Sequence, residues 1–230
     1  MRQGKPIIIA ARAVASALAR LRQAGTTPAV DTSPRLGFSP TRLLKHAGTR
    51  PEPAVSVPSE PVDAAYSPDG RRIATANWAG TGHVWDAASG AQLTTMAGHA
   101  GRIMEIVFSP DGTRVVTAGD DKTARVWDAV SGRQLLLLAG HGDALNGADY
   151  SPDGKTIATG SWDSTVRIWD AVDGKEVLLI EGETKLTDVA YSPDGRRLAA
   201  GSDEGTVFVW AITEGHAELL YKLAGHTAGV

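Results

Sequence analysis

The stretch that decides the fold is GHAGRIMEIVFSPDGTRVVTAGDDKTARVWDA, residues 98–129. The same order of motifs returns in GHGDALNGADYSPDGKTIATGSWDSTVRIWDA, residues 140–171. Over the whole chain the motif Ser-Pro-Asp-Gly begins at Ser67, Ser109, Ser151 and Ser192. These copies are 42, 42 and 41 residues apart, and a tryptophan follows each one after 18 residues. A fixed period of this length indicates a chain built from structural repeats.

Each repeat is predicted to contain four short strands. Runs of β-branched, aromatic and aliphatic residues alternate with turn sequences, which in residues 145–181 are Pro-Asp-Gly, Asp-Ser and Asp-Gly. A four-stranded sheet of this size is not stable alone, so neighbouring sheets must pack on one another. We expect these sheets at approximately 62–97, 103–139, 145–181 and 186–223, within a repeat region of residues 61–230 that ends with the start of a fifth unit.

The composition is that of an ordinary globular chain. The formal net charge of −3 gives no basic field, so we expect neither nucleic acid nor a membrane as partner. The chain has no cysteine, which excludes a thiolate nucleophile and a cysteine-based zinc site. It also lacks the HExxH, GxSxG and calcium-loop patterns. We therefore expect no catalysis, no cofactor and no metal.

The first 60 residues do not carry the repeat. Their most apolar stretch, residues 6–23, is interrupted by three arginines and is a poor candidate for a membrane span. The acid-free first 30 residues loosely resemble a transit or signal peptide, whereas the Pro-rich residues 49–61 favour an irregular segment. Residues 38–48 weakly match a repeat. We expect an irregular or partly helical leader of uncertain fold, and a cytoplasmic protein.

The order Gly-His, Ser-Pro-Asp-Gly, Asp-x-Thr and Trp-Asp resembles the WD40-repeat β-propeller family over about 170 of the 230 residues. The resemblance implies an all-β fold of four-stranded antiparallel blades set radially around a channel. Propellers typically close with four to eight blades, and this family most often has seven. Four repeats, followed by the first residues of another in LAGHTAGV, therefore predict a partial, truncated ring. Open blade edges in such a ring would allow self-association.

The resemblance also implies a hydrogen-bonded set within a blade, made of a histidine, a hydroxyl residue, an aspartate and the tryptophan. Two repeats carry the complete set, as His99, Thr117, Asp121 and Trp127 and as His141, Thr159, Asp163 and Trp169. Because an enzyme ordinarily builds its active site once, we interpret this duplicated set as a structural clasp rather than a catalytic triad. In the outer repeats Ala79 and Glu204 occupy the aspartate position, so neither is complete.

Partners of this family usually dock where the Gly-His turns and the turns between second and third strands emerge. The corresponding positions here are Arg102, Met104, Asp120, Ala144, Asn146, Trp162, Lys185, Thr187 and Asp203, with Glu60, Val62 and Trp78 by register. Four of the six tryptophans lie on predicted third strands, and the other two, Trp78 and Trp162, share one predicted surface position. Exposed tryptophan near arginine and methionine is typical of an interface hot spot. Alternatively, each indole lies flat on its own blade.

The sequence therefore favours a non-catalytic protein–protein interaction scaffold that presents these blade loops to another protein. An alternative is a sensor or regulatory module of a larger multidomain enzyme, such as a kinase or nucleotide-driven switch, whose catalytic part lies outside this chain. An enzyme using the central channel would need convergent His, Asp or Glu at the blade starts, where mostly apolar or small residues stand. Fold alone does not choose between these functions.

Overall fold

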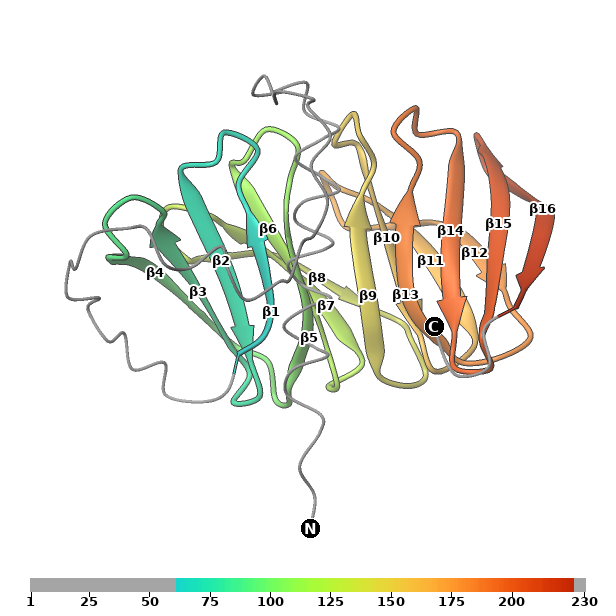
Figure 1. Cartoon of the computed structure of the whole chain (residues 1–230), viewed down its shortest axis with the longest axis horizontal. Coiled ribbons are helices and arrows are strands. Elements are labelled where there is room, and N and C mark those ends of the chain that lie inside the picture. Colours follow the sequence, from blue (N-terminus) through green and yellow to red (C-terminus); the bar gives the residue numbers. More distant parts are fainter. Residues whose placement is uncertain (1–60, 226–230) are drawn as a thin grey trace, which may run out of the picture.

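The computed structural model describes residues 61–225, which form four sheets of four antiparallel strands each (Figure 1). The strands are β1 (Pro61–Tyr66), β2 (Arg72–Asn77), β3 (Thr81–Asp86), β4 (Gln92–Ala97), β5 (Ile103–Phe108), β6 (Arg114–Gly119), β7 (Thr123–Asp128), β8 (Gln134–Ala139), β9 (Leu145–Tyr150), β10 (Thr156–Ser161), β11 (Thr165–Asp170), β12 (Glu176–Glu181), β13 (Leu186–Tyr191), β14 (Arg197–Ser202), β15 (Thr206–Thr213) and β16 (His216–Ala224). Predictions on the N-terminal leader and on the start of a fifth repeat lie outside the described residues.

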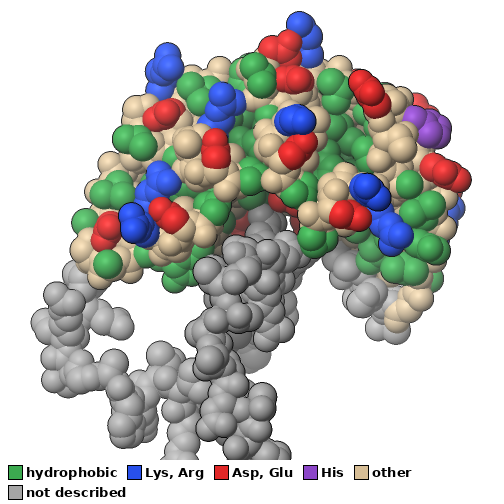
Figure 2. Space-filling model, turned by 90° about the horizontal axis from the view of Figure 1, so that it is seen from above, with side chains coloured by type: hydrophobic (Ala, Val, Ile, Leu, Met, Phe, Trp, Pro, Cys, Tyr) green, Lys and Arg blue, Asp and Glu red, His purple; other side chains and the backbone are tan. Residues whose placement is uncertain are grey.

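Each sheet takes four consecutive strands in chain order, and we call the sheets blades 1 to 4. The blades stand side by side from β1–β4 to β13–β16 and form an open arc (Figures 1 and 2). The first strands β1, β5, β9 and β13 pack on one another in succession. The structure therefore confirms the predicted fold class, an all-β partial propeller of four four-stranded blades.

The Ser-Pro-Asp-Gly motif closes the turn between the first and second strands of a blade. In blade 2, Ser109 Oγ donates to Asp111 Oδ1 at 2.6 Å and accepts from the Arg114 backbone N–H at 3.0 Å. Gly112 has a φ of +70°, in the left-handed region that glycine adopts without steric cost. Equivalent bonds recur in the other three blades, so the motif serves as a turn device.

The hydrophobic core lies between the blades. One cluster joins Ala74, Val84 and Met96 of blade 1 to blade 2, and two similar clusters join blade 2 to blade 3 and blade 3 to blade 4. In each cluster the tryptophan of a third strand, for example Trp127, packs toward the preceding blade. Every blade therefore depends on its neighbours for burial of its apolar surface.

Candidate partner-binding face

In blade 2 the four predicted clasp side chains are joined by hydrogen bonds. His99 Nδ1 lies 2.9 Å from Asp121 Oδ1, and His99 Nε2 lies 2.7 Å from Thr117 Oγ1. Trp127 Nε1 donates to the same Thr117 hydroxyl at 2.8 Å. Because a carboxylate only accepts, Nδ1–H of a neutral imidazole donates to Asp121, and Nε2 accepts from Thr117.

Blade 3 repeats this geometry with its own four residues. His141 Nδ1 lies 2.9 Å from Asp163 Oδ2, and Nε2 lies 2.8 Å from Thr159 Oγ1. Trp169 Nε1 donates to Thr159 at 2.8 Å. Thr117 and Thr159 are both 0% exposed, so no substrate can reach either hydroxyl. The arrangement has the members of a triad without the access that a nucleophile needs.

The charges within the two clasps follow from burial and hydrogen bonding. Burial on its own would raise the pKa of Asp121 and Asp163, but hydrogen bonds from neighbouring threonines, backbone N–H groups and the histidines lower each pKa to about 2. Burial lowers the pKa of His99 and His141, a shift that the partner aspartates only partly offset. At neutral pH each clasp therefore pairs a carboxylate with a neutral imidazole.

Each clasp fastens two loops that emerge on one face. Asp121 also accepts from the backbone N–H of Ala100, in the Gly-His turn, at 3.0 Å, and Asp163 accepts from that of Gly142 at 2.7 Å. Directly after these aspartates Lys122 and Ser164 have φ values of 66° and 68°, as expected for a tight turn. The residue before each aspartate is thereby fixed at the surface.

The outer blades are fastened differently. In blade 1 Trp85 Nε1 still donates to Thr75 at 2.8 Å, while Asn77 Oδ1 accepts from the backbone N–H groups of Ala79 and Thr81 at 3.0 Å each. Sequence reasoning missed Asn77, although an asparagine directly before a turn is a known signal for such bonds. In blade 4 Ser202 Oγ accepts from the Thr206 N–H at 3.1 Å.

Two tryptophan–cation pairs stand on this face. Trp78 is 49% exposed, and the Arg102 guanidinium lies 5.8 Å from its ring centroid. Trp162 is 40% exposed, and Lys185 Nζ lies 5.1 Å from its ring centroid. The first pair joins blades 1 and 2, and the second joins blades 3 and 4. We call the surface formed by Trp78, Arg102, Asp120, Trp162 and Lys185 the tryptophan face.

The family comparison agrees with this architecture. The family model described as the IFT122 first beta-propeller matches residues 61–230. The chain belongs to the IFT122 first beta-propeller family. Its four four-stranded blades are consistent with WD40 repeats, as the sequence predicted, and a propeller of this type suggests a protein-interaction role. The comparison with curated proteins finds no match.

Polar side chains separate the two tryptophans of this IFT122-type propeller. Arg102 Nε donates to Asp120, so the cation over Trp78 is also paired with a carboxylate. Asp120 holds in blade 2 the position that tryptophan holds in blades 1 and 3. In blade 4 that position is Asp203, which accepts from Thr184 Oγ1 at 2.8 Å.

Other predicted surface positions of the IFT122-type propeller are less accessible. Met104, Asn146 and Thr187 are the second residues of β5, β9 and β13 and are partly buried. Within the part of the chain that the structure describes, Asn146 Nδ2 is buried without a hydrogen-bond partner. The prediction that Val62 and Ala144 are exposed is wrong, since each is only 8% exposed. Their short side chains do not extend beyond the backbone, whereas Arg102 and Lys185 do.

Two features are absent from residues 61–225. No group of three His, Cys, Asp or Glu in this range could hold a metal ion. No helix in this range has the length and apolar character needed to cross a membrane. Glu60, which sequence register assigned to the partner face, lies outside the described residues.

Proposed function

We propose that this IFT122-type propeller is a non-catalytic protein–protein interaction scaffold and that its tryptophan face receives the partner. The observation that carries the proposal is the pair of half-exposed indoles, each held beneath a cation from the next blade. Large aromatic side chains dominate interface energetics when a partner buries them. Since Arg102 and Lys185 already lie over the two rings, and the clasp of blade 3 fixes the turn that carries Trp162, little side-chain entropy is lost on binding.

The chemistry of the tryptophan face favours a protein partner. Its centre combines aromatic rings with Arg102, Lys185 and Asp120, which is the mixture common in protein interfaces. The net charge of −3 offers no extended basic surface for a nucleic acid. An interacting protein would complement this face with apolar residues over the indoles and with carboxylates near the two cations.

The test is an alanine substitution of the tryptophan in each pair. A partner captured on the wild-type chain is purified, and its affinity for Trp162→Ala is measured by calorimetry. We expect a loss of about 30-fold, since a hot-spot side chain contributes about 2 kcal/mol. Trp78→Ala should also lower the affinity for this partner.

The matched control is Val172→Ala. Val172 is 76% exposed in the turn between β11 and β12, at the opposite end of blade 3 from Trp162. We expect this variant to bind the partner as the wild type does. Unchanged affinity of both tryptophan variants, or an equal loss in the Val172 control, contradicts the proposed role of the tryptophan face.

A further inference from the structure

The opposite face, seen in Figure 2, carries the Ser-Pro-Asp-Gly turns, and arginines there bridge neighbouring blades. Five residues after its motif serine, blade 1 has Arg72, which donates from Nη2 to Gly112 O of blade 2 at 2.7 Å. The same guanidinium lies 5.4 Å from the ring centroid of Phe108. In blade 2 the corresponding Arg114 donates from Nη1 to Ala171 O of blade 3 at 2.6 Å. An arginine is thus built into each of these two blade interfaces.

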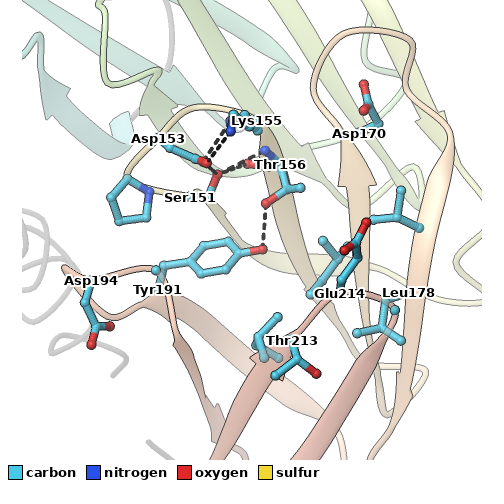
Figure 3. A pocket seen from close by; sticks show the side chains of 16 residues that line it. Ser151, Asp153, Lys155, Thr156, Asp170, Leu178, Tyr191, Asp194, Thr213 and Glu214 are labelled. Carbon is cyan, nitrogen blue, oxygen red and sulfur yellow. Dashed lines mark hydrogen bonds and ion pairs between the residues drawn. The ribbon is translucent and has the colours of Figure 1, made fainter.

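Blade 3 lacks this arginine, and a cavity lies in its place. The corresponding residue is Thr156, whose hydroxyl lies 3.0 Å from Tyr191 Oη of blade 4 (Figure 3). The cavity beside this pair measures about 530 Å³, within the size range of ligand-binding pockets. Its lining includes Gly195 and Ile212 of blade 4. These two residues correspond in the repeat to Gly112 and Ala171, whose backbone carbonyls accept from the arginines in the other two interfaces. Tyr191 is the counterpart of Phe108.

A second departure from the repeat keeps this groove open. A Cβ added to Gly132 or Gly174, in the last turns of blades 2 and 3, would approach the preceding blade to 2.3 Å and 3.2 Å. A Cβ added to the corresponding Gly215 of blade 4 would meet nothing within 4 Å. In blade 3 the Asp170 carboxylate accepts from the turn N–H groups, but blade 4 has Ala211 there. Strands β15 and β16 instead continue to Thr213 and His216.

The charge of the groove suits a cation. Its lining contains four carboxylates, Asp153, Asp170, Asp194 and Glu214. The lining has one cationic side chain, Lys155, and its Nζ already lies 3.5 Å from Asp153 Oδ2. Figure 3 shows Glu214 on the wall across from the Tyr191–Thr156 pair. Ile168 and Leu178 add an apolar wall against which an aliphatic stem can pack.

We propose that the groove between blades 3 and 4 binds an arginine side chain from a peptide segment of a partner protein. The guanidinium would lie over Tyr191, as Arg72 lies over Phe108, with the carboxylates balancing its charge. A planar guanidinium stacks on an aromatic ring and donates in several directions, whereas a lysine ammonium does neither as well. This site is on the face opposite the tryptophan face, so the two proposals succeed or fail separately.

The test is an NMR titration of the full chain with acetyl-Leu-Arg-Leu amide. We expect saturable shifts of the Thr156, Tyr191 and Gly195 amide signals. The citrulline peptide, which keeps the shape but not the charge, should produce no saturable shift. The lysine peptide should bind about tenfold more weakly than the arginine peptide.

Substitutions of residues in the groove provide a second test of the proposal. Thr156→Arg supplies the arginine that the repeat carries in blades 1 and 2, so this variant should fold normally. Because the new side chain would fill the groove, the variant should no longer bind the arginine peptide. Thr156→Ser, the matched control, should bind as the wild type does. Glu214→Gln should weaken binding about two- to five-fold, the range for an exposed ion pair.

Four results would overturn the proposal. These are equal binding of the arginine and citrulline peptides, equal binding of the arginine and lysine peptides, shifts that map away from the groove, and unchanged binding by Thr156→Arg. Loss of partner binding by the Trp162 variant has no bearing on this site, because Trp162 is on the other face.

Discussion

At the residue scale, burial decides what an aspartate, a histidine and a threonine do together. In blades 2 and 3 these side chains have the mutual distances of a catalytic set, yet both threonines are fully buried and their hydroxyls accept from a tryptophan. Each carboxylate accepts a hydrogen bond from a loop N–H group as well as one from the imidazole. The set therefore orders the loops of the tryptophan face.

The Asp163→Ala substitution tests the clasp. It removes the acceptor of the buried His141 Nδ1–H and of the Gly142 N–H, so we expect a loss of about 2–4 kcal/mol in unfolding free energy. Urea unfolding followed by circular dichroism measures this loss. The control is Asp173→Ala, whose carboxylate pairs with Lys175 at the surface, and this variant should unfold as the wild type does. A stability of Asp163→Ala equal to that of the wild type would refute the structural role.

The pKa shifts of the clasps predict how stability changes with pH. His99 and His141 have lowered pKa values in the fold, so the unfolded chain binds their protons more readily once the pH drops below about 6.5. Asp121 and Asp163 have their pKa lowered from 3.8 to about 2, so their contribution is present above pH 3.8 and is lost as the pH falls toward 2. We expect the unfolding free energy to decrease as the pH falls below about 6.5, and to decrease again as the pH falls from 3.8 toward 2.

Urea unfolding measured at a series of pH values from 7 down to about 2 tests this expectation. The variant His141→Gln should show a smaller decrease between pH 7 and 5 than the wild type, because one of the two buried imidazoles is absent. A wild-type stability that stays constant from pH 7 to pH 5 would be incompatible with neutral, buried histidines.

At the element scale, the turn sequences made the strands predictable. Ser-Pro-Asp-Gly, Gly-His and Trp-Asp each specify one local geometry, so strand order and the positions of the tryptophans follow from the sequence alone. Features that depend on a neighbouring blade did not follow from it. The burial of Ala144 and the cavity beside Thr156 arise from packing between blades, which the local pattern does not describe.

Gly80 shows how closely neighbouring blades approach. It has a φ of +79°, and an added Cβ would lie 2.6 Å from the backbone oxygen of Gly101 in the connection between blades 1 and 2. We expect Gly80→Ala to destabilise the fold by more than about 2 kcal/mol, through backbone strain and displacement of this connection. The midpoint of urea unfolding is the readout.

The matched control is Gly70→Ala. Gly70 has a similar φ of +69°, but an added Cβ would meet nothing within 4 Å. This variant should cost only about 1 kcal/mol, the strain of a left-handed alanine. If the two variants lose the same stability, the close approach at Gly80 contributes nothing beyond φ strain.

At the scale of the whole molecule, the surface of blade 4 that faces away from blade 3 bears on self-association. Tyr221 and Leu223 of β16 are exposed, lie opposite Val209 and Val207 of β15, and form an apolar row that no described residue covers. A second copy of the chain could cover such a row of apolar side chains. We expect light scattering to give twice the chain mass of 24.0 kDa at high concentration.

The variant Tyr221→Glu places a charge in this row and should return the mass to that of one chain. As a control, Val130→Ala changes an exposed valine in the β7–β8 turn of blade 2 and should leave the mass unchanged. A mass of 24.0 kDa for the wild type at every concentration would exclude self-association through blade 4.

We propose above that the tryptophan face receives a protein partner. Hydrogen–deuterium exchange of the propeller, with and without a partner captured on the wild-type chain, tests it most directly because it maps protection over the whole molecule. We expect slower exchange at residues 77–81, 99–103, 119–123 and 161–165 when the partner is bound. Protection confined to the Ser-Pro-Asp-Gly turns, with unchanged exchange around Trp78 and Trp162, would contradict it.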